Sequence, residues 1–251
     1  MASLDVVLMA AGLGSRLGEL TRHLPKALIP VAGKPLLAYG LGFARLLAPR
    51  RIIVVGGFEF EQVADTLEAL RKGPAADLPI ELVQNAAFRR GNILSFQAAR
   101  PHLVGDFLIL NVDHIYRPTI APLVAAPVTD VTGFIDTDRT LGADDMKVLR
   151  DAEGRIQEIA KPLSQFDCGY VGMTRVPAEA KARYLAAVDE AIREDGEDIH
   201  VERVLARLAR TSLPPHCRDI SGHGWLEVDT PEERHQAEGA LGGGAFDGLR
   251  A

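Results

Sequence analysis

The sequence is poor in cysteine and in aromatic residues, and it has no long apolar run. Its 251 residues include only two cysteines, Cys168 and Cys217, and aromatic residues make up 6% of the chain. So little cysteine excludes a disulfide-stapled secreted scaffold, and neither cysteine has metal-ligand spacing around it. No apolar segment approaches the roughly 20 residues that a membrane helix needs, and no basic leader precedes the first apolar segment. We therefore expect a soluble, cytoplasmic protein.

A surplus of positive charge is also lacking. The chain has 28 basic and 34 acidic residues, which gives a formal net charge of -6. This balance argues against nucleic acid as a partner, but it allows an anionic small molecule if local cations or a metal gather the phosphate. Hydrophobic residues make up 47% of the chain, which is enough to form a buried core, and charged residues make up 25%. These fractions predict a globular chain with a sizeable core.

The first half of the chain alternates short apolar runs with amphipathic segments. This alternation predicts parallel strand–helix–strand units with right-handed crossovers. The expected strands are residues 5–9, 51–55, 80–83 and 107–111, and the expected helices are residues 35–47, 59–71 and 92–100.

After residue 130 the pattern indicates a more antiparallel half. Residues 151–154 combine acids with a glycine between two apolar runs, which predicts a hairpin. We expect one α/β domain over residues 1–240 and a flexible, glycine-rich tail over residues 241–251. The expected strands are residues 131–135, 146–150, 155–160 and 224–228, and the expected helices are residues 178–193, residues 201–209 and one that begins near Pro231.

Two glycines and an arginine follow the first expected strand. Gly12, Gly14 and Arg16 lie at its carboxyl end, where open parallel sheets bind ligands. Glycine lets backbone N–H groups approach an anion, and a guanidinium matches phosphate oxygens. The segment lacks the third glycine of a dinucleotide fingerprint and the Gly-Lys-Ser/Thr ending of a Walker loop. It predicts a phosphate-binding loop, with an ordinary glycine-rich turn and a solvated arginine as the alternative.

A lysine held between prolines favours the phosphate-binding interpretation. Lys26 follows Pro25, so the chain carries two small residues, Gly-x-Gly-x-Arg, a variable gap and Pro-Lys. Residues 10–37 thereby resemble the opening signature of the sugar-phosphate and alcohol-phosphate nucleotidyltransferases. The resemblance implies a single Rossmann-like, glycosyltransferase-A-like α/β domain with a central mixed, mostly parallel sheet flanked by helices. It also implies catalytic roles for Arg16 and Lys26 on the transferred phosphoryl group and pyrophosphate, and a nucleotide site formed by Ala10, Ala11, Gly12, Gly14, Ser15 and Arg16.

Two aspartates close apolar runs that are far apart in the sequence. Asp113 follows residues 107–112, and Asp229 follows residues 225–228. A carboxylate at a strand end suits magnesium, which takes one or two carboxylates and completes its shell with waters and phosphates. For either residue alone, a turn or helix-cap aspartate is the alternative. The resemblance implies that both bind Mg²⁺, because the family holds its metal with aspartates at these two places.

Further segments resemble the cytidylyltransferases of this family. Residues 91–95 read Gly-Asn-Ile-Leu-Ser, where uridylyl- and thymidylyltransferases usually have a Gly-Thr-rich segment. The resemblance implies CTP as the nucleotide, bound by Asn85, Gly91, Asn92 and Ser95. Asn92 and Ser95 could hydrogen-bond a cytosine edge or the ribose, and a helix cap is the alternative for Asn92.

The acceptor is less clearly indicated. Residues 113–116 are similar to the Asp-His-x-Tyr of the inositol-1-phosphate branch, and Lys147, Lys161 and Asp167 resemble that branch's acceptor-binding residues. Solvated charges are the alternative for the two lysines. Glu227 followed by Asp229 is closer to the phosphocholine enzymes. Inositol 1-phosphate is therefore expected first, with phosphocholine and a sugar 1-phosphate as alternatives.

The expected reaction transfers a cytidylyl group from CTP to a small alcohol phosphate and releases pyrophosphate. Its product, a CDP-alcohol, could feed a membrane CDP-alcohol phosphotransferase. Two other classes stay open: a non-catalytic nucleotide-binding regulator, and a glycosyltransferase with an Asp-x-Asp metal motif. Asn111 stands where that motif has its first acid, and Lys26 has no role in it.

Overall fold

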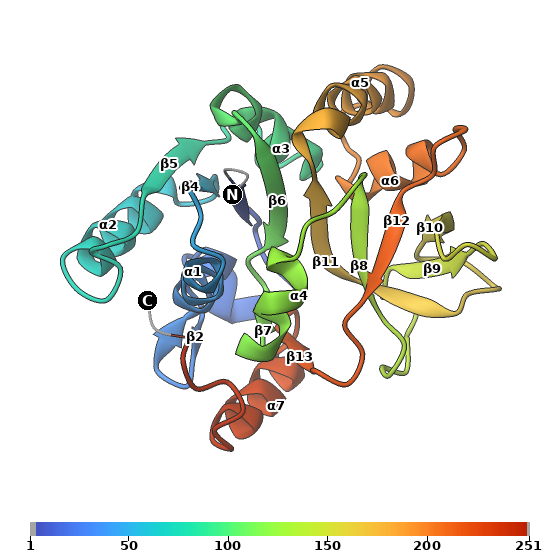
Figure 1. Cartoon of the computed structure of the whole chain (residues 1–251). Helices are drawn as coiled ribbons and strands as arrows, with labels where there is room; N and C mark the ends of the chain where they lie inside the picture. The colour runs from blue at the N-terminus through green and yellow to red at the C-terminus, as the bar shows by residue number, and fades with distance from the viewer. Residues whose placement is uncertain (1–3, 250–251) are drawn as a thin grey trace.

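Strand β1 (Leu4–Ala10) lies inside the sheet that organises the molecule. It pairs in parallel with β4 (Arg51–Gly56) on one side and β6 (Asp106–Asn111) on the other (Figure 1). All seven of its residues are buried, because helices cover both faces of this part of the sheet. The uninterrupted apolar run at the start of the chain therefore forms an interior parallel strand, as predicted.

The sheet is mixed, and its antiparallel part centres on β11 (Cys168–Val176). The computed structural model describes residues 4–249, and nine strands form the sheet within that range. Parallel order runs through β5, β4, β1 and β6, and β11 is antiparallel to β6, β8 and β9. The predicted change from a parallel to a more antiparallel half is confirmed. The other strands of the sheet are β5 (Ile80–Gln84), β8 (Thr132–Asp136), β9 (Lys147–Arg150), β10 (Ile156–Ala160) and β12 (His216–Asp219).

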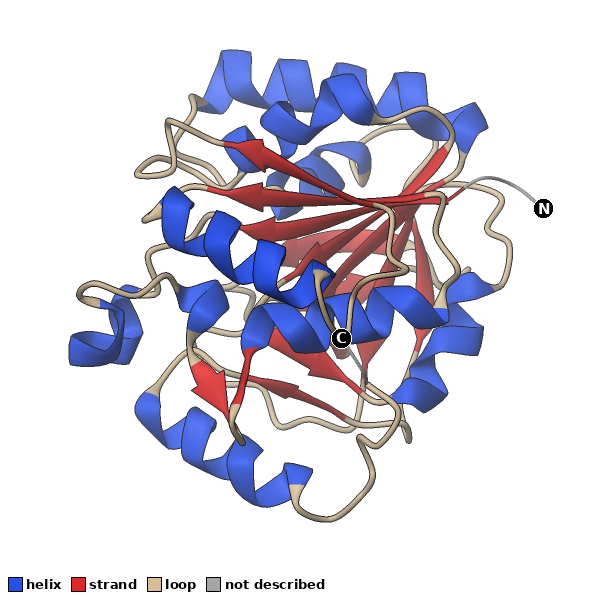
Figure 2. Ribbon diagram, turned by 90° about the vertical axis from the view of Figure 1, so that its left-hand side faces the viewer, coloured by secondary structure: helices blue, strands red, loops and turns tan. Residues whose placement is uncertain are grey.

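Helices pack on both faces of the sheet (Figure 2). Side chains of β1 alternate between two apolar clusters: Val6 and Leu8 pack with α1 and α2, whereas Val7 and Met9 pack with α3, α5 and α6. Because successive side chains of a strand point to opposite faces, the sheet separates two apolar cores. The helices are α1 (Leu36–Leu46), α2 (Phe60–Arg71), α3 (Ile93–Ala99), α4 (Ala121–Ala125), α5 (Ala178–Asp195), α6 (Glu202–Leu208) and α7 (Pro231–Leu241).

The predicted bounds of α1, α2, α3, α5 and α6 agree with the structure to within two residues. The expected hairpin is also present, as β9 and β10 pair in antiparallel order across residues 151–154. No helix within residues 4–249 is long and apolar enough to cross a membrane.

Strand β11 is the main element that the sequence did not predict. All nine of its residues are buried, yet Gly169, Gly172 and Arg175 interrupt its apolar pattern. Gly172 has φ +72°, at the point where the register with β8 shifts, and the guanidinium of Arg175 pairs with Asp106 at 3.2 Å. Local sequence at these three positions disfavours a buried strand. Contacts with the rest of the fold, such as the ion pair of Arg175, allow the strand to form.

The last predicted strand, residues 224–228, lies outside the main sheet. Its core, β13 (Trp225–Glu227), pairs in antiparallel order with the short strand β7 (His114–Tyr116). A further small ribbon joins β2 (Pro30–Val31) and β3 (Lys34–Pro35). These short pairs were not predicted because they have too few residues to show a period.

Two residues of the predicted flexible tail pack against the domain. Phe246 and Leu249 are 5% and 3% exposed and belong to the apolar cluster under α1. The guanidinium of Arg117 lies 5.3 Å from the centre of the Phe246 ring. Residues 250–251 of the tail lie outside the described residues, and the domain limits stay a prediction.

Candidate active site

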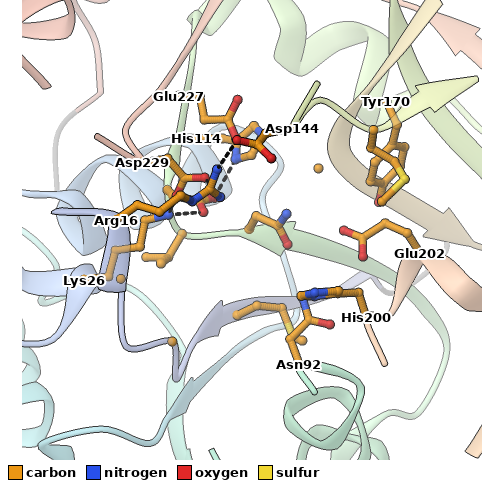
Figure 3. A pocket seen from close by; sticks show the side chains of 18 of the residues that line it. Arg16, Lys26, Asn92, His114, Asp144, Tyr170, His200, Glu202, Glu227 and Asp229 are labelled. Atoms are coloured by element: carbon orange, nitrogen blue, oxygen red, sulfur yellow. Dashed lines mark hydrogen bonds and ion pairs between the residues drawn. The ribbon is translucent and has the colours of Figure 1, made fainter. Parts of the chain in front are cut away.

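A cleft of about 370 Å³ opens at the carboxyl ends of β1 and β6. Met9 and Asn111, the paired residues near the ends of these strands, line its floor. Its walls come from the loop after β1, from α3, from residues 136–146 and from β11 (Figure 3). The cleft therefore lies where an open parallel sheet is expected to bind its ligand.

The loop after β1 presents its backbone to the cleft. Ala11, Gly12, Gly14, Ser15 and Arg16 line the cleft, and a Cβ on Gly12 would meet no atom within 4 Å. The sixth predicted loop residue, Ala10, is buried in β1 and does not line it. The loop leaves open backbone beside a half-exposed guanidinium, an arrangement that suits phosphate oxygens.

Gly14 lets Lys26 pack against this loop. Its φ is +66°, a left-handed conformation that glycine adopts at little cost. A Cβ at this position would lie 2.9 Å from the Cβ of Lys26. Thr21 closes the turn by donating a hydrogen bond from Oγ1 to the Gly14 carbonyl at 2.8 Å.

Lys26 brings the two predicted metal ligands to one point. Its Nζ donates to Asp113 Oδ2 at 2.5 Å and also to Asp229 Oδ1. Arg16 donates to the other oxygen of Asp229 and lies 3.7 Å from Asp144 (Figure 3). Lys26 and Asp229 are each 7% exposed. Four of the predicted site residues are thus assembled in one charged cluster.

The pairing of β7 with β13 explains why the two aspartates meet. Asp113 precedes β7 and Asp229 follows β13, and the backbone N–H of Val228 donates to the Asp113 carbonyl at 2.9 Å. Asp229 is further positioned by the start of α7, where Thr230 and Glu233 form a capping box. Glu233 also accepts a hydrogen bond from the backbone N–H of Asp229 at 2.8 Å.

Charge partners keep Asp113 ionised. Burial alone raises the pKa of Asp113, but the charges of Lys26 and His114 outweigh it and hold that pKa well below its usual range. Burial lowers the pKa of His114, and Asp113, whose Oδ1 lies 2.6 Å from Nδ1, raises it by more, so the net direction is upward. A permanently ionised carboxylate at this position is suited to bind a cation.

The two carboxylates also fit the predicted magnesium. Both reach one cation, the Lys26 ammonium, so their oxygens already converge on a shared position. Hard carboxylate oxygens are the ligands that Mg²⁺ prefers, with waters and substrate phosphates filling the rest of its shell. Within residues 4–249 no group of three or more His, Cys, Asp or Glu side chains is arranged to hold a metal. Two carboxylates leave most of the shell of Mg²⁺ to waters and substrate phosphates.

The predicted cytosine-binding residues divide into two kinds. Asn92 and Ser95 line the cleft, whereas Asn85 and Gly91 do not. Asn85 is buried and donates from Nδ2 to Ser95 Oγ at 3.0 Å, so it supports Ser95 from behind. Gly91 packs against the backbone of residues 197–199, which a Cβ would overlap at 2.0 Å.

Asn92 does not cap its own helix. Its Oδ1 accepts a hydrogen bond from the backbone N–H of Val201 at 2.7 Å, which ties α3 to the start of α6. This contact orients the amide group at the edge of the cleft.

Of the predicted acceptor residues, only Lys161 lines the cleft. Lys147 is buried, and its Nζ donates to the carbonyls of Gly142 and Lys161 at 2.6 and 2.9 Å. Asp167 is exposed and accepts from the guanidinium of Arg150 at 3.0 Å. The structure does not bring Lys147 and Asp167 to the cleft wall, because each is held by other partners.

Several residues that the sequence did not single out also line the cleft. Trp225 stacks on His114, with ring centres 5.0 Å apart, and the guanidinium of Arg139 lies over the Trp225 ring, 4.7 Å from its centre. The indole N–H donates to buried Asp136 at 2.7 Å. Glu202, on the first turn of α6, faces the cleft beside Tyr170 (Figure 3). No local motif marks these residues, since four separate segments supply them.

A family model described as a MobA-like NTP transferase domain matches residues 6–211. The CMP-5'-(3-aminopropyl)phosphonate synthase of Streptomyces rubellomurinus is 31% identical over 245 residues, which cover 92% of this chain and 38% of that protein. A bifunctional IPC transferase and DIPP synthase of Aquifex aeolicus is 27% identical over 249 residues, which cover 97% of this chain and 53% of that protein. The chain spans about half, or less, of the length of these relatives.

Two solved structures have the same fold. The inositol-1-phosphate CTP transferase from T. maritima superposes with a TM-score of 0.78, at 20% identity, over 96% of this chain and 97% of that one. The CTP:phosphocholine cytidylyltransferase from Streptococcus pneumoniae superposes with a TM-score of 0.73, also at 20% identity, over 96% of this chain and all of that one. The expected fold class, a single Rossmann-like α/β nucleotidyltransferase domain, is confirmed.

Proposed function

This chain belongs to the MobA-like NTP transferase domain family, and from that premise we propose that it transfers the cytidylyl group of CTP to a small molecule with a terminal phosphate or phosphonate. The main support for this proposal is that Lys26, Asp113 and Asp229 converge beside the open loop after β1. This cluster combines a backbone phosphate cradle, two cationic side chains and a pair of ionised carboxylates. Such a combination serves phosphoryl chemistry in which no covalent enzyme intermediate forms.

The reaction needs charge neutralisation and alignment. An oxygen of the acceptor attacks the α-phosphorus of CTP, a new P–O bond forms, and the bond to the bridging oxygen of pyrophosphate breaks. Gly12 and its neighbours hold the triphosphate through backbone N–H groups, and Arg16 and Lys26 neutralise charge on the departing pyrophosphate. Asp113 and Asp229 would hold Mg²⁺, which when bound supplies further charge neutralisation to the phosphate oxygens.

CTP is proposed as the donor on two grounds. Asn92 and Ser95 line the cleft with side chains that can hydrogen-bond a cytosine edge or the ribose. The names of the two solved structures described above specify CTP. The buried Asn85–Ser95 hydrogen bond fixes this wall before the nucleotide arrives.

For the acceptor, the resemblance in the sequence puts inositol 1-phosphate first, with phosphocholine and a sugar 1-phosphate as alternatives. The relatives' names cover inositol 1-phosphate, phosphocholine and (3-aminopropyl)phosphonate, all of which carry a phosphorus oxygen that can attack CTP. The resulting CDP- or CMP-linked product would be a donor for a phosphotransferase, and a membrane enzyme of that kind is the downstream partner we propose.

The test is pyrophosphate release with each nucleoside triphosphate against a panel of phosphomonoesters and phosphonates, with and without Mg²⁺. We expect release with CTP and one acceptor class, and only with the metal present. CTP binding without release with any acceptor would support a nucleotide-binding regulator instead, and consumption of a nucleotide sugar would support a glycosyltransferase. Either result overturns the proposal.

A further inference from the structure

Glu202 is a buried carboxylate without a partner. Only 8% of its surface is exposed, and within residues 4–249 its side chain makes no hydrogen bond and no ion pair. Figure 3 shows it pointing toward the middle of the cleft, between Tyr170 and His200. A carboxylate that faces the cleft in this way can accept hydrogen bonds from a cationic ligand.

Tyr170, Arg139 and Arg16 do not pair with Glu202, because each has another partner. The hydroxyl of Tyr170 is already hydrogen-bonded to Thr174 Oγ1 at 2.8 Å. Arg139 is paired with Glu227 at 3.1 Å, and Arg16 with Asp229. Arg16 and Arg139 are thus committed elsewhere, and the carboxylate of Glu202 stays available to a ligand.

Glu202 lies on the side of the cleft opposite Lys26, beside Tyr170 and near Asn92 (Figure 3). The loop after β1 and Asn92 form the walls proposed for CTP. The rest of the wall, with Tyr170 on β11 and Lys161, is left for the acceptor. Lys161 makes no ion pair within the described residues, so this wall offers one cation and one anion.

Trp225 and Phe166 do not offer a cage for a quaternary ammonium. Such a cage needs free ring faces. Trp225 stacks on His114 at an interplanar angle of 9°, and the guanidinium of Arg139 also lies over its ring. Phe166 lies 5.6 Å from the Lys147 ammonium and does not line the cleft. A carboxylate without a cage suits a primary ammonium, which donates hydrogen bonds.

We infer that the acceptor is a primary amine that carries a phosphate or phosphonate, with its ammonium on Glu202 and its anionic end toward Lys161 and the Lys26 cluster. This inference rests on the proposed cytidylyl transfer and names the acceptor class within it, in place of the inositol 1-phosphate that the sequence resemblance puts first. Glu202 is then the specificity-determining residue, because a neutral hydroxyl in place of the ammonium would leave its charge unpaired.

The first test uses the unmodified protein and two acceptors that differ at one group. 3-Aminopropylphosphonate and 3-hydroxypropylphosphonate are compared at equal concentration with CTP and Mg²⁺, beside inositol 1-phosphate and phosphocholine. We expect kcat/KM for the amine to exceed that for each of the other three by at least about tenfold. Equal or better use of any of the three, with CTP consumed, overturns this inference and leaves cytidylyl transfer standing. Failure of every acceptor overturns both.

A second test removes the charge of Glu202 without changing its size. Glu202→Gln should reduce the amine-to-hydroxyl ratio of kcat/KM to near one, while CTP affinity stays within about twofold. Its Tm should equal or exceed that of the parent, because an unpaired buried charge is lost. The matched control is Glu158→Gln on an exposed position of β10, which should keep the parental ratio. An unchanged ratio in Glu202→Gln contradicts the inference.

Discussion

At the scale of single residues, Asp113 and Asp229 hold Lys26 between them, and the same oxygens are the proposed ligands of Mg²⁺. The charges of this site are balanced, because Lys26 and Arg16 face the two carboxylates. Loss of either carboxylate both removes a metal ligand and leaves a buried ammonium with one partner fewer.

We therefore expect Asp113→Asn and Asp229→Asn each to reduce kcat/KM for pyrophosphate release by on the order of a hundredfold or more. Far-ultraviolet circular dichroism should stay unchanged, because the amide keeps the size of the carboxylate. Asp65→Asn, on an exposed turn of α2, serves as the matched control. Near-normal activity of either variant at low Mg²⁺ would exclude that residue as a ligand.

The two cysteines lead to a prediction about reactivity. Burial raises the pKa of Cys217 to about 12, and burial also raises that of Cys168 well above its usual range. With a pKa near 12, about one Cys217 thiol in ten thousand is a thiolate at pH 8. The folded protein should therefore react slowly with a thiol-disulfide reagent at pH 8, and both thiols should react after unfolding in guanidinium. Rapid reaction of the folded protein would show that the thiols are accessible and ionised.

At the scale of elements, the loop between β1 and Lys26 depends on one glycine. Gly14→Ala forces a left-handed conformation, at a cost of about 1 kcal/mol, and brings its Cβ 2.9 Å from the Cβ of Lys26. We expect a lower Tm and at least a tenfold loss of kcat/KM, because Lys26 must move away from Asp113.

The matched control is Gly239→Ala in α7, where an added Cβ meets no atom within 4 Å. That change should stabilise the protein by roughly 0.5–1 kcal/mol, since alanine favours a helix interior. Parental activity in Gly14→Ala would mean that the loop tolerates a displaced lysine.

At the scale of the whole molecule, the chain terminus closes part of the core. Phe246 packs in the cluster that includes α1 and β1, with Arg117 over its ring. Phe246→Ala should therefore reduce the free energy of unfolding by about 3 kcal/mol, as expected for a buried phenylalanine. Leu213→Ala, at a position 55% exposed, should change it by less than about 0.5 kcal/mol. An unchanged unfolding midpoint for Phe246→Ala would support the freely flexible tail that the sequence predicts.

The sequence by itself determined the parts of this protein that local chemistry can encode. Continuous apolar runs marked the interior strands, because both faces of such strands are buried. The helical spacing of apolar residues marked five helices, because one face of each is buried. The loop after β1 and the two aspartates each follow an apolar run, and the resemblance to the nucleotidyltransferase signature implied the metal role of the aspartates and the role of Lys26. Family membership and fold class followed from that pattern.

Only the tertiary structure decided which of these residues meet. The pairing of β7 with β13 brings Asp113 and Asp229 together, and strands of three residues carry no readable period. Strand β11 forms despite two glycines and an arginine because its partners satisfy them. Lys147 and Asp167 have the right chemistry for an acceptor, yet backbone carbonyls and Arg150 hold them elsewhere. Glu202 is an ordinary helical glutamate in the sequence, and only its burial without a partner in the folded protein marks it for function.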